Sequence, residues 1–215
     1  MKRFCSWGGG KDSYLAWVRA SEADSPLPLL TMVVSGNDST HQSYGEVVQR
    51  QAMALEIPLV SESVSWESYE DRFKDTVGEL GADFGVFGTI DVEEHRSWVK
   101  STCSTLDVTP KFPLWGEDPV DLYYEILDRG WEVRIVKLDA TRIDERWLGE
   151  PLDTDFLEFL LDNSVHPMGE HGEYQTLVLD GPGFNRRVPV EITGSSSLGD
   201  YRIAQLDVGE VGENR

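Results

Sequence analysis

Apolar runs alternate with segments of helical periodicity along the first half of the chain. Consecutive apolar positions are typical of strands buried on both faces, and they predict strands at residues 1–5, 28–34, 58–60 and 84–89. Between these runs, helical spacing of apolar residues predicts helices over residues 14–20, 46–55, 66–80 and 93–106. A short extended run follows at 111–114. Strands that alternate with helices predict a doubly wound parallel sheet, which is an α/β fold.

The second half of the chain has a different pattern. Helical spacing predicts two helices, at residues 120–127 and 156–161. Between them, alternation of apolar and polar residues predicts a half-exposed strand at residues 131–138. Two antiparallel strands, 187–192 and 201–208, are expected to be joined by a turn at Gly194-Ser195-Ser196-Ser197. We therefore expect a first domain over residues 1–106 and a smaller α+β subdomain over residues 107–215.

Three consecutive glycines follow the first predicted strand. Gly8, Gly9 and Gly10 lead into Lys11, Asp12 and Ser13, which open the first helix. A glycine turn before a helix start presents backbone N–H groups to a phosphate, and the missing side chains allow close approach. A Walker A loop is excluded because Asp12 separates the lysine from the serine. The dinucleotide fingerprint is excluded because Ser13 stands where its third glycine would be.

Two other strand ends are expected beside this turn, because ligands bind at the carboxyl ends of the strands in such sheets. They are Val34-Ser35 and Gly88-Thr89, whose backbone would contact adenine and ribose. An ordinary strand-to-helix turn is the alternative for Gly88-Thr89.

Composition excludes several classes of protein. The 215 residues, 40% of them hydrophobic, suffice for a packed core, and the net charge of −20 disfavours binding to DNA or RNA. We expect no membrane partner, because no apolar run spans a bilayer and the first residues predict a strand rather than a signal peptide. Two cysteines make no disulfide framework, and four histidines lack metal-ligand spacing. A cytoplasmic protein is expected.

The glycine turn resembles the PP-loop of the ATP pyrophosphatases, Ser-Gly-Gly-x-Asp-Ser, with Gly8 in place of the first serine. Further segments resemble the diphthine–ammonia ligase family, whose members join ammonia to a carboxylate using ATP. These segments are Ser6-Trp7, Gln51-Ala52, Ile57-Pro58-Leu59, Gly88-Thr89-Ile90, Glu94-His95-Arg96, Pro113-Leu114-Trp115-Gly116, Trp147-Leu148-Gly149 and residues 169–176. The resemblance implies an adenine nucleotide α-hydrolase-like fold.

The resemblance also implies the chemistry. ATP and Mg²⁺ would be the cofactors, and the partners would be ammonia and a carboxylate acceptor, either a small molecule or a modified protein residue. Attack of the carboxylate on the α-phosphorus would give an acyl adenylate and pyrophosphate, after which ammonia expels AMP. Residues 8–13 would bind the nucleotide, with Lys11 stabilising the leaving phosphates. Asp12 would either place Mg²⁺ or favour the helix start.

The acceptor site is expected in the polar segment 169–176. Glu170, Glu173 and Tyr174 are candidates for holding the acceptor or deprotonating ammonium, and the further substrate-binding candidates are His95, Arg96, His171, Gly172 and Gln175. A solvated loop and an exposed helix start are the alternatives. Relatives that amidate diphthine carry glutamate where Gln175 stands, whereas a sister group is suspected of amidating a cobalamin precursor. We therefore expect better activity on a small carboxylic acid than on diphthine.

Two other classes stay open. An RNA-modifying PP-loop enzyme would be expected to have a basic surface and Cys-x-x-Cys pairs, and this chain has neither. A nucleotide-binding module without catalysis is the other class, for which Gly8 in place of serine is the hint. A homodimer is a further possibility.

Overall fold

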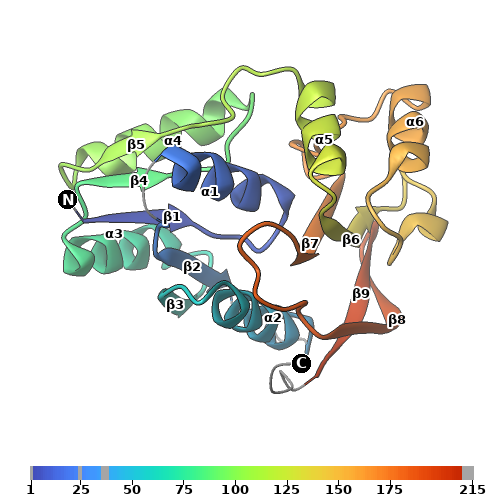
Figure 1. Ribbon diagram of the computed structural model, residues 1–215, viewed down its shortest axis with the longest axis horizontal. Coiled ribbons are helices and arrows are strands. Elements are labelled where there is room, and N and C mark those ends of the chain that lie inside the picture. Colours follow the sequence, from blue (N-terminus) through green and yellow to red (C-terminus); the bar gives the residue numbers. More distant parts are fainter. Residues whose placement is uncertain (1, 24–25, 35–38, 210–215) are drawn as a thin grey trace.

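The computed structural model describes residues 2–23, 26–34 and 39–209. Two sheets lie side by side, with helices between them and on their outer faces (Figure 1). The first sheet is parallel, with the strand order β3-β2-β1-β4-β5. Its strands are β1 (Arg3–Ser6), β2 (Leu29–Val34), β3 (Leu59–Val64), β4 (Phe84–Val86) and β5 (Thr109–Lys111). The doubly wound α/β prediction is confirmed.

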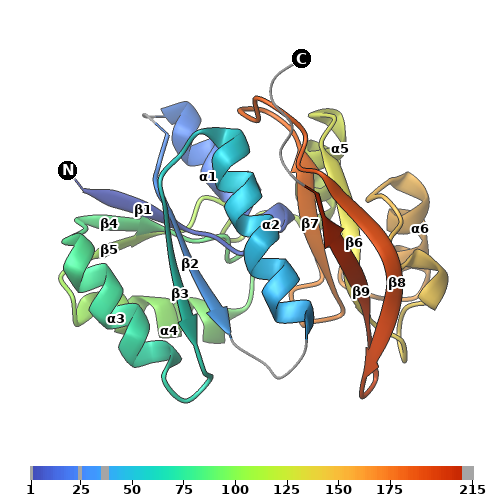
Figure 2. The ribbon, with the colours of Figure 1, turned by 90° about the horizontal axis from the view of Figure 1, so that it is seen from below.

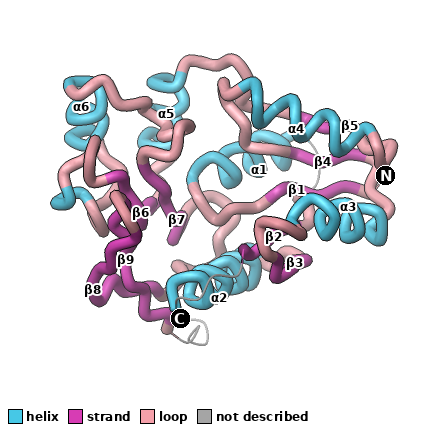
Figure 3. The backbone as a smooth tube through the Cα atoms, turned by 180° about the vertical axis from the view of Figure 1, so that it is seen from behind, coloured by secondary structure: helices cyan, strands magenta, loops and turns pink. Residues whose placement is uncertain are grey.

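Four helices cover the parallel sheet. They are α1 (Lys11–Ala23), α2 (Ser39–Leu55), α3 (Tyr69–Leu80) and α4 (Glu93–Ser104). Helices α1 and α2 lie between the two sheets and contact both of them (Figure 2). Helices α3 and α4 lie on the side of the first sheet that faces away from the second (Figure 3). There they enclose an apolar cluster that includes Phe4, Phe73, Phe87, Val99 and Cys103.

The second sheet is antiparallel, with the order β7-β6-β9-β8. Its strands are β6 (Glu132–Asp139), β7 (Tyr174–Asp180), β8 (Val190–Leu198) and β9 (Tyr201–Val208). Helices α5 (Pro119–Asp128) and α6 (Thr154–Asp162) and the 3₁₀ turn Glu145–Trp147 accompany it. The expected small α+β part is present.

Two local expectations were wrong. Gly194-Ser195-Ser196-Ser197 is not a turn but part of β8, paired with β9, and the hairpin turns at Gly199-Asp200 instead. Gly199 has φ 59°, the left-handed conformation that a tight hairpin turn requires. Strand β8 is an edge strand with mostly exposed side chains, so it carries few of the apolar residues that would identify a strand. Likewise, Tyr174, Gln175 and Thr176 belong to strand β7 rather than to a loop.

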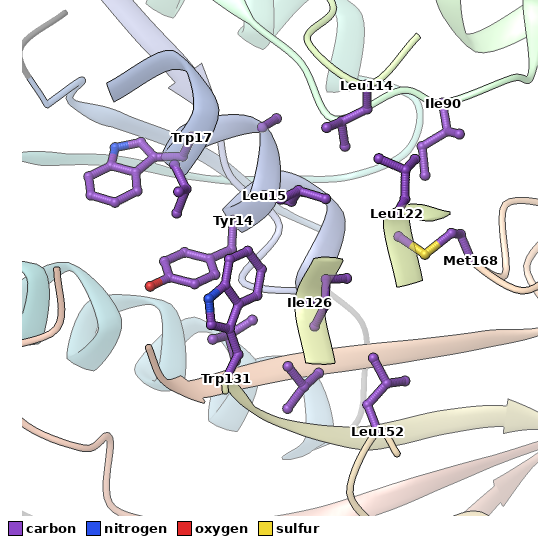
Figure 4. Close-up of a cluster of buried hydrophobic side chains, with 14 of the residues drawn as sticks. Tyr14, Leu15, Trp17, Ile90, Leu114, Leu122, Ile126, Trp131, Leu152 and Met168 are labelled. Carbon is purple, nitrogen blue, oxygen red and sulfur yellow. The ribbon is translucent and has the colours of Figure 1, made fainter. Parts of the chain in front are cut away.

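One apolar core joins the two halves of the chain. Tyr14 and Trp17 on α1 pack with Trp131, whose ring centroid lies 4.4 Å from that of Tyr14 (Figure 4). Ile126 and Leu152 extend the same cluster into the second half. No helix in the described ranges combines the length and apolar composition needed to cross a membrane.

A buried amide ties the two sheets together. Gln51 on α2 is fully buried, and its Nε2 donates to the carbonyl oxygens of Gly9 and Val178, both at 2.8 Å. Its Oε1 accepts from Trp7 Nε1 at 2.9 Å. The amide thus pairs with three groups on two segments, the turn after β1 and strand β7.

Gln51→Leu should therefore destabilise the fold, because each buried polar group left unpaired costs about 1–3 kcal/mol. We expect a loss of about 3 kcal/mol in the free energy of unfolding, measured by urea denaturation. Met53→Leu, at an exposed position of the same helix, is the control and should change the value by less than about 0.5 kcal/mol. Equal urea midpoints for both variants would contradict this role of Gln51.

Candidate functional site

A cavity of about 920 Å³ opens at the carboxyl edge of the parallel sheet. Its walls come from the turn after β1, the loop after β4, the N-terminal halves of α3 and α4, Tyr44 of α2, residues 169–172 and the start of β7. The sequence-predicted residues that line it are Gly8, Gly10, Lys11, Asp12, Ser13, Gly88, Thr89, His95, Glu170, His171, Gly172, Tyr174 and Gln175. The fold thus gathers the phosphate-binding and acceptor-binding candidates around one space.

The glycine loop (residues 8–13) is shaped by its own hydrogen bonds. Ser13 Oγ accepts from the N–H of Gly8 at 3.2 Å and donates to the carbonyl of Gly10 at 3.1 Å. Gly9 has φ 71°, a left-handed conformation that favours glycine. The first N–H groups of a helix have no intrahelical acceptor, so the start of α1 offers donors to an anion in the cavity.

Strand β7 holds the glycine loop from the other domain. The N–H of Lys11 donates to Thr176 Oγ1 at 3.1 Å, and the N–H of Val178 donates to the carbonyl of Gly9 at 3.0 Å. A Cβ on Gly10 would lie 2.9 Å from the carbonyl oxygen of Thr176. Only glycine allows this close approach, so packing by itself requires glycine at position 10.

The Lys11 ammonium is held in the wall of the cavity. The residue is 2% exposed, and its Nζ donates to the carbonyl of Met168 at 2.7 Å and pairs with Asp12 Oδ2 at 3.0 Å. It also lies over the ring of Tyr174, 4.8 Å from the centroid. The positive charge therefore has a fixed position beside the glycine loop.

Two carboxyl groups face the same space. Asp12 Oδ1 is buried and has no hydrogen-bond partner among the described residues. Glu170 Oε2 accepts from the N–H of Ile90 at 3.3 Å. Burial, and then the charge of Asp12, raise the pKa of Glu170 to about 7. An unpaired carboxylate oxygen next to a second carboxyl group suits a cation, and Mg²⁺ is commonly held by one or two carboxylates together with substrate phosphates.

Tyr174 and Glu173 are more deeply placed. The Tyr174 hydroxyl donates to the carbonyl of Pro167, and burial raises the pKa of the phenol well above its ordinary value. Glu173 lies outside the cavity lining, with its side chain fully buried. Its carboxylate accepts from Arg142 Nη1 at 3.0 Å and from the N–H of His171 at 2.9 Å. These contacts hold the segment that carries Glu170, and the direct roles expected for both residues stay predictions.

Among the described candidates, Gly9, Val34 and Arg96 also lie outside the cavity lining. Arg96 stacks over the ring of Trp115, 4.2 Å from its centroid. Val34 ends strand β2 and does not line the cavity, and Ser35 lies outside the described residues. Gly88 packs tightly on α1, since a Cβ there would lie 2.8 Å from the carbonyl of Asp12.

Sequence reasoning missed the aromatic part of the lining. This part consists of Tyr44, Tyr69, Phe73, Phe87 and Trp98. One signal in the sequence could have indicated it. Trp98 follows the candidate His95 by three residues, so the two share a face of α4. The described residues contain no group of three or more His, Cys, Asp or Glu that could hold a metal by themselves.

Residues 1–110 match the family model of the diphthamide synthase N-terminal domain, and residues 118–205 match that of the C-terminal domain. A diphthine--ammonia ligase from Bos taurus is 33% identical over 108 residues, covering 48% of this chain and 40% of that relative. A diphthine--ammonia ligase from Danio rerio is 29% identical over 215 residues, covering 86% and 84%. The chain thus spans less than half the length of the bovine relative.

The hydroxyl of Thr176 should be needed for both stability and nucleotide affinity. Thr176→Val keeps the shape but leaves the buried N–H of Lys11 without an acceptor, which costs about 1–3 kcal/mol. We expect this loss in urea denaturation and about tenfold weaker ATP binding in calorimetry. Thr176→Ser, which retains the hydroxyl, should bind ATP like the wild type. Unchanged ATP affinity in Thr176→Val would contradict the positioning role.

Proposed function

The chain belongs to the diphthamide synthase family, and we propose that it is an ATP-dependent amide ligase that joins ammonia to the carboxylate of diphthine. The observation that carries this proposal is the convergence of the glycine loop, the buried Lys11 and the Glu170 carboxyl on one cavity. Six relatives carry the diphthine--ammonia ligase name. They favour diphthine over the small carboxylic acid that Gln175 led us to expect.

Nucleotide binding is assigned to the glycine loop and the start of α1. Their N–H groups and the Lys11 ammonium would hold the phosphates of ATP. Among the described residues lining the cavity, this single lysine faces the carboxylates of Asp12, Glu94 and Glu170. Asp12, whose Oδ1 is unpaired among the described residues, would hold Mg²⁺ together with the phosphates, and the ion would offset phosphate charge when bound.

The acceptor carboxylate then attacks the α-phosphorus of ATP. A bond forms between the carboxylate oxygen and this phosphorus, and the bond to the bridging oxygen breaks, so pyrophosphate departs with the electron pair. Donors already fixed in the glycine loop stabilise the charge that develops on it. The carboxylate oxygen is thereby converted into part of a good leaving group, AMP.

Ammonia completes the reaction at the acyl carbon. Ammonium must first lose a proton, and Glu170 is the group we assign to accept it, because a pKa of about 7 suits a base at neutral pH. The nitrogen attacks the acyl carbon, AMP leaves, and the amide remains.

The products test the proposed cleavage. Turnover of ATP with ammonium and diphthine-bearing elongation factor 2 should release AMP and pyrophosphate in a 1:1 ratio with the amide. Nucleotide chromatography and mass spectrometry of the acceptor measure both. Gly10→Val is the inactive control, because its side chain would meet the carbonyl of Thr176. ADP as the only nucleotide product would overturn the mechanism.

The pH dependence tests the role of Glu170. Below pH 7 its carboxyl is mostly protonated and accepts no proton, so amide formation should rise with pH and level off above about pH 7. In Glu170→Gln the rate of amide formation should no longer rise with pH, and it should be about 10²–10⁴-fold lower than that of the wild type. Glu158→Gln, at an exposed position of α6, is the matched control.

Stability gives an independent readout of the same group. A raised pKa in the folded state means that ionisation of Glu170 opposes folding. Its contribution to stability is fully present below pH 4.5 and is lost as the pH rises to about 7. Glu170→Gln should lack this loss in urea titrations. A pH–rate profile of Glu170→Gln that parallels the wild type would show that another group takes the proton.

A further inference from the structure

Four aromatic side chains form a continuous row from the protein surface into the cavity. We call Trp66, Tyr69, Trp98 and Phe73 the aromatic ladder. Trp66 is 78% exposed and stacks on Tyr69, with ring centroids 5.9 Å apart and planes at 25°. Trp98 lies 5.9 Å from both Tyr69 and Phe73. Its inner three members line the cavity.

The ladder is placed and held by the fold. Tyr69 is the first residue of α3 and Trp98 is the sixth residue of α4, and both line the cavity at the carboxyl edge of the sheet. The indole Nε1 of Trp98 donates to Glu70 Oε2 at 3.2 Å, which fixes the ring. Tyr69 and Trp98 are half-buried, and each therefore keeps part of its surface free for a ligand.

The charges around the ladder favour a cation. Glu94 is exposed, lines the cavity and precedes Trp98 by four residues on α4, so the two share a helix face. Aromatic faces attract cations through the ring quadrupole, and aromatic cages are the usual means of binding quaternary ammonium groups. An acidic cavity strengthens the same preference.

We propose that the aromatic ladder, together with Glu94, binds the quaternary ammonium group of the acceptor. The inference rests on the proposed function, because diphthine carries a trimethylammonium group beside the carboxylate to be amidated. Gln175 is neutral and cannot hold that positive group, so the ladder supplies the recognition that this position lacks. Adenine would also stack on these rings and could donate its N6 amino group to Glu94, but it carries no positive charge for the ring faces and the carboxylate to attract.

Two small probes of the same shape test the charge preference. Glycine betaine carries a trimethylammonium group and a carboxylate, and 3,3-dimethylbutanoate replaces its nitrogen with carbon. Calorimetry on the full chain, with a non-hydrolysable ATP analogue present, should give at least tenfold tighter binding of glycine betaine. Trp98→Leu and Tyr69→Leu should each remove at least tenfold of that affinity without changing the Kd of the ATP analogue. Tyr69→Phe, which keeps the aromatic ring, should bind glycine betaine with the affinity of the wild type.

Tyr124→Leu, at an exposed aromatic position on α5, is the control and should bind both probes like the wild type. Equal or undetectable binding of the two probes by the wild type overturns the proposal. The proposal is also overturned if Trp98→Leu and Tyr69→Leu bind the ATP analogue more weakly but keep their affinity for glycine betaine. That result would assign the ladder to the nucleobase. Amide formation on diphthine without betaine discrimination refutes the ladder alone, whereas betaine discrimination without amide formation refutes only the ligase.

Discussion

The hydrogen bonds between the glycine loop and strand β7 are the constraint on which the site depends. The N–H of Val178 donates to the carbonyl of Gly9, and Thr176 Oγ1 accepts from the N–H of Lys11. Gln51 adds a second tie to both segments from α2. A phosphate-binding loop needs its N–H groups fixed before the ligand arrives. Here strand β7 of the antiparallel sheet supplies that rigidity, so the proposed nucleotide site depends on contacts between the two halves of the chain.

Charge sets the second constraint. The chain has a net charge of −20, and the described lining of the proposed nucleotide cavity presents one buried lysine against several carboxylates. Burying the Lys11 ammonium is tolerated because the carbonyl of Met168, the carboxylate of Asp12 and the ring of Tyr174 replace its water. A polyanionic substrate in such a cavity needs a divalent cation, whereas a cationic acceptor is attracted without one. The same electrostatics thus serve both proposed substrates.

The segment before β7 links the proposed acceptor side of the cavity to the loop after β4. Glu170 accepts from the N–H of Ile90, and His166 Nε2 lies 2.9 Å from Asp91 Oδ2. His166 Nδ1 accepts from the N–H of Met168, so the ring proton sits on Nε2 and points to Asp91. The loop after β4 is thus bonded directly to Glu170, the group to which we assign proton transfer, and to His166 in the segment before it.

The sequence by itself determined the order of strands and helices in the first half and the chemistry of residues 8–13. Both depend on local properties, namely the periodicity of apolar residues and the backbone freedom of glycine. Only the tertiary structure decided how these pieces meet. The contact between Lys11 and Thr176 joins residues 165 positions apart, and the aromatic ladder combines side chains from α3, α4 and the segment before α3. The edge strand β8 was mistaken in part for a turn because its exposed positions carry no apolar pattern. Contacts between distant segments leave no periodic trace in a single sequence, since each side chain satisfies a partner that only folding brings near.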